Sequence, residues 1–131
     1  MVAFHPEPNH RVLLIDDDAD SREIYRQTLE WCGYAVETAA NGRAGLRAAI
    51  IRPPDAILLD LDMPGMSGVE LLRALRAEPR TARVPVAALT GAPELLDHVD
   101  GITFDMVLAK PAIGDQVTAA VQRLVNLAAE P

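Results

Sequence analysis

Short apolar runs that end abruptly in aspartate constrain the fold of this chain more than any other sequence feature. The run Val12–Ile15 stops at three consecutive aspartates, and the run Ala56–Leu59 stops at Asp60. Short, continuously apolar runs bounded by polar residues are typical of strands that are buried on both faces. Such strands occur mainly in parallel sheets covered by helices. We therefore expect both runs to lie inside a parallel sheet.

Segments with helical spacing alternate with further strand-like segments along the rest of the chain. The spacing and the Gly and Pro stops predict helices over Ala19–Cys32, Gly42–Arg52, Gly68–Ala77 and Ala112–Ala128, with two further turns over Pro93–Val99. The remaining strands are predicted over Tyr34–Ala39, which should be an edge strand, Val84–Leu89 and Phe104–Ala109. The residues that share one face of the first helix are Ile24, Thr28, Leu29 and Cys32, and those on one stripe of the last are Ile113, Val117, Ala120, Val121 and Leu124.

The alternation of strands and helices predicts an α/β fold. Five strands separated by helices imply a five-stranded parallel sheet with right-handed crossovers. With the first and third strands inside, the strand order is 2-1-3-4-5 and helices lie on both faces, which is the flavodoxin-like doubly wound fold. Ligands of such sheets bind outside the carboxyl ends of the strands, where strands 1 and 3 diverge. The aspartates lie at that edge.

Composition and charge limit the classes of protein to which the chain can belong. Its 131 residues suit one domain, and we expect residues 1–10 to be a flexible lead-in, 11–128 the folded domain and 129–131 a frayed tail. The net charge of −7 argues against a nucleic-acid surface on this domain. No apolar run can cross a bilayer, and no signal-peptide pattern is present, so we expect a cytoplasmic location without membrane contact. The single cysteine, Cys32, is expected to be a buried apolar side chain rather than a reactive thiol.

The candidate site consists of polar residues at the ends of four predicted strands. They are the acidic triplet Asp16–Asp18, Asp60, Thr90 and Lys110. Because parallel strands end at one edge of the sheet, we expect these residues to converge. Each has an ordinary structural reading when taken alone, since an Asp after a strand often caps the next helix, as Asp18 or Asp20 should here. Together they form a much more specific pattern.

The chemistry that suits this pattern is phosphoryl transfer onto a carboxylate. Several carboxylates in one cleft repel one another unless a proton, a lysine or a cation offsets their charge. Mg²⁺ prefers oxygen ligands and uses few protein carboxylates. A carboxylate such as Asp60 can attack phosphorus and form an aspartyl phosphate. Lys110 would then place a positive charge on one phosphate oxygen, and Thr90 would donate a hydrogen bond to another.

The motifs that contain these residues resemble receiver domains of two-component response regulators, from about Arg11 to Leu127. The matching segments are RVLLIDDD, PDAILLDLDMPGMSGVELLRALR, VPVAALTG and VLAKPA. The resemblance places the family's acidic pair, phosphoacceptor, hydroxyl and lysine on Asp16 and Asp17, Asp60, Thr90 and Lys110.

The resemblance also implies ligands and partners. It implies Mg²⁺ bound by Asp17, Asp60 and the main-chain carbonyl of Asp62, with Asp16 acting mostly through water. It implies a phosphohistidine donor on a histidine kinase or phosphotransfer protein, an unidentified downstream protein target, and a monomer or weak dimer. A receiver is a signalling domain that catalyses only its own phosphorylation and dephosphorylation, so no other enzymatic activity is expected. By the same resemblance, the Lys110–Pro111 peptide bond should be cis.

Two departures from the family pattern concern how phosphorylation is transmitted to a partner, rather than the residues of the phosphoryl-transfer site. Val107 stands where the family usually has Tyr or Phe, and Thr90 and Lys110 are about two residues closer in sequence than in familiar members. We therefore expect phosphorylation to act mainly through the segment after Thr90 or through a different face.

Three alternatives stay open at this point. A degenerate receiver would only bind proteins. A haloacid-dehalogenase-type phosphatase shares the Asp60-Leu61-Asp62 spacing, although that motif usually opens its domain. A flavodoxin would need a Ser/Thr-rich phosphate loop where this chain has three aspartates.

Overall fold

The computed structural model, which describes residues 10–94, 103–112 and 114–129, contains one parallel five-stranded sheet in the order β2-β1-β3-β4-β5. The strands are β1 (Arg11–Ile15), β2 (Ala35–Ala39), β3 (Ala56–Asp60), β4 (Val86–Thr90) and β5 (Met106–Ala109). The helices are α1 (Ala19–Trp31), α2 (Gly42–Ile51), α3 (Gly68–Ala77) and α4 (Gly114–Ala129). The predicted fold class and strand order are confirmed.

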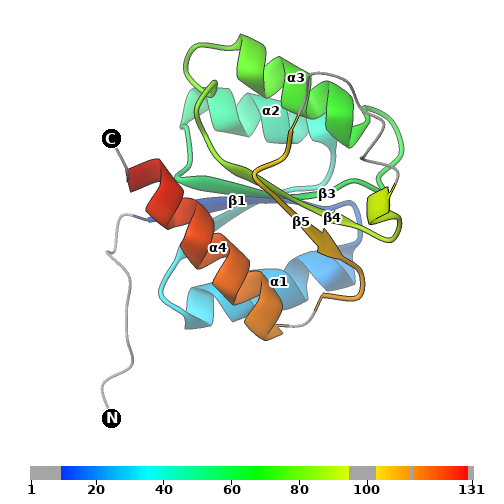
Figure 1. Ribbon diagram of the computed structural model, residues 1–131, viewed down its shortest axis with the longest axis vertical. Helices are drawn as coiled ribbons and strands as arrows, with labels where there is room; N and C mark the ends of the chain where they lie inside the picture. The colour runs from blue at the N-terminus through cyan, green and yellow to red at the C-terminus, as the bar shows by residue number, and fades with distance from the viewer. Residues whose placement is uncertain (1–9, 95–102, 113, 130–131) are drawn as a thin grey trace.

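Helices cover both faces of the sheet, with α2 and α3 on one side and α1 and α4 on the other (Figure 1). A hydrophobic core lies on each face of the sheet. Alternate residues of β1 pack into one core or the other, because successive side chains of a strand point to opposite faces. Val12 and Leu14 pack in the core beneath α1 and α4, whereas Leu13 and Ile15 pack in the core beneath α2 and α3. A strand buried on both sides has to be apolar throughout, which explains the run that ends at the aspartates.

The interior and edge positions of the strands follow the sequence pattern. Every residue of β3 and β4 is buried, whereas β2 and β5 lie at the two edges and are only partly buried. β1 and β3 are both interior strands, as predicted. In the part of the chain that the structure describes, no helix has the length and apolar character needed to span a membrane.

Several predicted element boundaries were wrong by one or two residues. The predicted strand from Val84 begins at Val86, because the Val84 N–H still donates to the Thr81 carbonyl in the preceding turn, at 3.1 Å. The strand predicted from Phe104 begins at Met106, and the helix predicted from Ala112 begins at Gly114. The prediction of two helical turns over residues 93–99 falls largely outside the described residues. Residue 113, which was predicted to lie on the last helix, is also outside them.

The predicted face of α1 requires a correction. Ile24 was grouped with Leu29 and Cys32, yet 62% of Ile24 is exposed. The face that packs on the core carries Tyr25, Leu29 and Cys32, which follow the i, i+4, i+7 spacing, and Ile24 lies one position off it. Cys32 is a free thiol, half-buried rather than fully buried.

Candidate functional site

The carboxyl edge of the sheet gathers the predicted site residues because the strands end in register. Asp60 is the last residue of β3 and pairs with Leu89 of β4, and Thr90 pairs with Ala109 of β5. The Lys110 N–H donates to the Thr90 carbonyl at 2.9 Å, which continues the ladder one residue beyond β5. Asp60 and Thr90 are only 3% and 4% exposed, so both side chains are held in the buried part of the edge.

Three carboxylates meet at this edge. Asp16, Asp17 and Asp60 each offer an oxygen, and these oxygens lie within 4.8 Å of one another. Asp16 is buried, and burial together with the nearby charge of Asp60 raises the pKa of Asp16 to about 6. The cluster therefore resists full ionisation unless a positive charge enters, and its all-oxygen donor set is the kind that Mg²⁺ prefers.

The segment that carries the acidic triplet is held by its own hydrogen bonds. The carboxylate of Asp16 accepts the Asp18 N–H at 2.9 Å. Asp18 in turn caps α1, because its side chain accepts the Ser21 N–H at 3.0 Å. The expectation that Asp18 or Asp20 would cap this helix is confirmed for Asp18. Asp17, which lies between Asp16 and Asp18, is exposed.

Lys110 supplies the positive charge of the site. Its Nζ lies 2.7 Å from Oδ1 of Asp60 and 3.1 Å from Oδ2 of Asp62. Partial burial lowers the pKa of Lys110, but the two carboxylates outweigh that effect and raise it above its ordinary value. The Lys110–Pro111 peptide bond is cis, as predicted. Lys110 is therefore a permanently charged ammonium in contact with the candidate phosphoacceptor.

The side chain of Asp62 is a part of the site that sequence reasoning missed. It accepts the Thr90 hydroxyl at 3.2 Å and the Gly91 N–H at 3.1 Å, in addition to its contact with Lys110. Partial burial opposes ionisation, but the Gly91 N–H and the Lys110 ammonium lower the pKa of Asp62 below its ordinary value. The sequence assigned this residue only a main-chain carbonyl ligand. An acid two residues after Asp60 was the available signal, but it does not indicate where the side chain points.

The loop after β3 is shaped to present Asp62 in this way. The Asp62 N–H donates to Oδ1 of Asp60 at 2.9 Å, which turns the chain directly after the strand. Further on, a Cβ atom at Gly68 would lie only 2.0 Å from a methyl carbon of Leu61, so the start of α3 packs tightly against the loop. The loop is thus anchored on both sides of Asp62.

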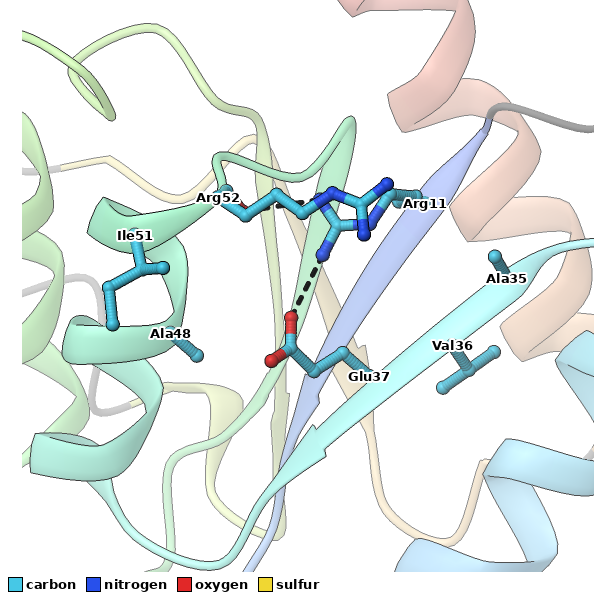
Figure 2. Close-up of a pocket in the computed structure, with 7 residues that line it drawn as sticks. All are labelled: Arg11, Ala35, Val36, Glu37, Ala48, Ile51 and Arg52. Carbon is cyan, nitrogen blue, oxygen red and sulfur yellow. Dashed lines mark hydrogen bonds and ion pairs between the residues drawn. The ribbon is translucent and has the colours of Figure 1, made fainter.

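A hollow of about 370 Å³ lies beside the edge strand β2 (Figure 2). Arg11 crosses it and donates to Glu37 at 2.9 Å and to the Arg52 carbonyl at 3.2 Å. Arg11 and Ala35 are the first residues of β1 and β2, so this hollow lies at the amino ends of the strands. It is therefore separate from the acidic edge, and its Arg11 and Glu37 side chains pair with each other.

The fold and the acidic edge define a phosphoryl-accepting α/β signalling domain. The family model for the response regulator receiver domain matches residues 12–122, and the chain belongs to this family. It is thus a receiver domain of the two-component type, as the sequence motifs indicated. Membership of this family excludes the phosphatase and flavodoxin alternatives.

Known relatives agree with this assignment. The chain is 35% identical over 118 residues to the DNA-binding dual master transcriptional regulator RpaA of Synechocystis, covering 88% of this chain and 49% of RpaA. The chemotaxis protein CheY4 of Vibrio cholerae superposes with a TM-score of 0.81 at 32% identity, covering 88% of this chain and 98% of CheY4. The receiver domain of the sensor histidine kinase PA1611 from Pseudomonas aeruginosa, solved with magnesium in its active-site cleft, superposes with a TM-score of 0.81 at 28% identity, covering 90% of this chain and 98% of that domain. The chain spans about half the length of RpaA.

Proposed function

We propose that Asp60 is the phosphoacceptor of this receiver domain and that Thr90 and Lys110 assist the transfer. The observation that carries the proposal is the contact of the Lys110 ammonium with the Asp60 carboxylate, at 2.7 Å, at the buried end of β3. A carboxylate oxygen of Asp60 attacks the phosphorus of a phosphohistidine, and the electron pair of the P–N bond leaves with the imidazole nitrogen. Lys110 and Thr90 then stabilise charge on the phosphoryl oxygens.

Magnesium fits the donor set at this edge. Asp17, Asp60 and the main-chain carbonyl of Asp62 would hold the ion directly, with Asp16 acting mostly through bound water. When bound, the ion neutralises negative charge on the phosphoryl group and on the carboxylate cluster. The support is the closeness of the Asp16, Asp17 and Asp60 oxygens, together with the pKa of Asp16, which burial and the neighbouring Asp60 raise to about 6.

The partners follow from the chemistry. We propose a histidine kinase or histidine phosphotransfer protein as donor and a downstream protein as target, because phosphohistidine transfers readily to a carboxylate in such a site. The DNA-binding function in the name of RpaA belongs to a protein about twice as long, and the net charge of −7 argues against nucleic-acid contact by this domain. The absence of other enzymatic activity, the cytoplasmic location, the domain boundaries and a monomeric or weakly dimeric state stay predictions.

The test is phosphorylation of the purified protein by acetyl phosphate and Mg²⁺, followed by intact mass. We expect one added phosphoryl group in the wild type and none in Asp60→Ala. The control is Glu37→Gln, which removes one negative charge in the hollow beside β2 and should be labelled like the wild type. A label that persists in Asp60→Ala would contradict the assignment.

A receiver that binds partners without accepting a phosphoryl group is the second candidate. The observation in its favour is Val107, which is 41% exposed on β5 and offers no aromatic ring to report the state of the site. A wild type that takes up no phosphoryl group from acetyl phosphate or from a phosphorylated histidine kinase would favour this alternative.

A further inference from the structure

The carboxylate of Asp62 binds three donors that converge on the mouth of the site. They are the hydroxyl of Thr90, the N–H of Gly91 and the ammonium of Lys110, at 3.2, 3.1 and 3.1 Å. A hydroxyl, a main-chain N–H and an ammonium that point at one place form a typical oxyanion-binding set. In this structure a side chain of the protein itself fills that set.

The same donors border the phosphoacceptor. Lys110 bridges the two carboxylates, because its Nζ contacts Asp60 and Asp62 at once. A phosphoryl group on Asp60 would project out of the buried end of β3 toward Thr90 and Lys110. It would therefore need donors that Asp62 now holds, and the Thr90 hydroxyl, which has a single hydrogen to donate, cannot serve both anions together.

We propose that the carboxylate of Asp62 is a built-in occupant of the phosphoryl-binding donors, which a phosphoryl group on Asp60 displaces. The inference rests on the proposed role of Asp60. It assigns Asp62 a side-chain role in addition to the main-chain ligand expected from the sequence. Asp62 thereby weakens the binding of the phosphoryl group by competition.

Displacement of Asp62 is physically easy. Its side chain is 45% exposed, so the carboxylate can turn toward solvent and regain its hydration. The phosphoryl group carries more negative charge than a carboxylate and has more acceptor oxygens. Because it is covalently attached to Asp60, it competes for Lys110 as a fixed neighbour rather than a diffusing one.

The release of Asp62 also provides a route for the signal. In the unphosphorylated protein, Asp62 ties the loop after β3 to Gly91 and so to the segment that follows β4. Displacement breaks this connection between two loops while Val107 on β5 is unaffected. The output path is thus expected to run through these loops, which suits a chain without an aromatic residue at position 107.

The experiment compares the affinity of the Mg²⁺-loaded protein for beryllofluoride, a phosphoryl mimic, in the wild type, Asp62→Asn, Asp62→Ala and Glu37→Gln. Asp62→Ala should bind about tenfold more tightly, as expected from removing one charge-assisted competitor. Asp62→Asn, which keeps an acceptor oxygen but loses the charge, should lie between Ala and the wild type. Glu37→Gln controls for the change in net charge and should match the wild type.

A purely structural role for Asp62 predicts the opposite order, with the weakest binding in Asp62→Ala, and this order or equal affinities would overturn the proposal. Wild-type protein that binds no beryllofluoride would overturn the proposed function as well, whereas normal wild-type binding with unchanged variants would refute only the role of Asp62.

Discussion

The two ends of the sheet both contain carboxylates and cations, but they use them differently. At the amino ends, the Arg11 guanidinium pairs with Glu37, and the Arg11 N–H donates to Asp55 at 2.7 Å. At the carboxyl ends, three carboxylates crowd together, and Lys110 contacts one of them, Asp60, together with Asp62. Charges that have partners of opposite sign stabilise local structure. Carboxylates held close together raise one another's pKa and favour the binding of a cation. Net repulsion, rather than the presence of ion pairs, distinguishes the functional end.

The largest expected difference between the two ends concerns Lys110. Lys110→Ala should slow phosphorylation by acetyl phosphate by about a hundredfold, since it removes the only cation in contact with Asp60 among the described residues. Arg11→Ala, the matched loss of a cation at the amino ends, should leave the rate unchanged. Time courses of intact mass measure both. Equal rates in wild type and Lys110→Ala would remove the catalytic distinction between the ends.

The acidic cluster should cost stability when it is ionised without a cation. The pKa of Asp16 rises from 3.8 to about 6 on folding, so the folded state favours the protonated form, and stability is lost as pH rises through this range. Asp16→Asn keeps an acceptor for the Asp18 N–H but cannot ionise. In EDTA at pH 7.5 it should be more stable than the wild type by about 3 kcal/mol.

Urea unfolding of both proteins at pH 4 and pH 7.5 measures this effect. The advantage of Asp16→Asn should nearly vanish at pH 4, where Asp16 is protonated in the fold. Glu37→Gln, whose exposed ion pair contributes about 0–1 kcal/mol, should show no gain at either pH. A gain for Asp16→Asn that is equal at both pH values would contradict the charge-based explanation.

Asp17, the exposed aspartate of the cluster, should affect the binding of Mg²⁺ rather than the stability of the fold. Asp17→Ala is expected to weaken Mg²⁺ binding by roughly tenfold or more, because it removes a direct oxygen ligand. Amide shifts around the site during a Mg²⁺ titration report the affinity better than the fluorescence of Trp31, which is 85% exposed at the far end of α1. Unchanged affinity in Asp17→Ala would exclude this ligand.

A substitution at the amino ends of the strands should change the stability of the protein without changing the binding of a phosphoryl mimic. Arg11→Ala removes the hydrogen bonds from the guanidinium to the carbonyls of Arg52 and Pro53, and the pair with Glu37. We expect a loss of about 1 kcal/mol in the free energy of unfolding, with normal beryllofluoride binding. Impaired binding would mean that the two ends are coupled.

The smallest expected effect lies on β5. On addition of beryllofluoride, amide shifts should change strongly over Thr90–Glu94 and only slightly at Val107 and on the outer surface of α4. Val107 is β-branched and has few rotamers, so it offers no second arrangement that the site can select. Changes at Val107 and α4 as large as those near Thr90 would show that the signal crosses this face after all.

Local sequence patterns determined most of the fold and most of the candidate site. Continuous apolar runs placed β1 and β3 inside the sheet, because a strand covered on both faces needs apolar side chains at every position. The parallel topology then predicted that Asp60, Thr90 and Lys110 meet at one edge, whatever their separation along the chain. The Asp18 cap of α1 was equally predictable, since its partner Ser21 is only three residues away.

Tertiary packing decided what local patterns leave open. Ile24 and Leu29 were both assigned to one apolar stripe of α1, but the packing of α1 on the sheet buried Leu29 and left Ile24 exposed. The direction of the Asp62 side chain is a similar case, because its partners Thr90 and Gly91 are 28 and 29 residues away and come from another strand end. Periodicity and capping operate within a few residues, so the sequence by itself placed the polar residues at the ends of their strands. The contacts among these residues depend on the distances between the loops that carry them, and those distances are set only once the sheet has formed.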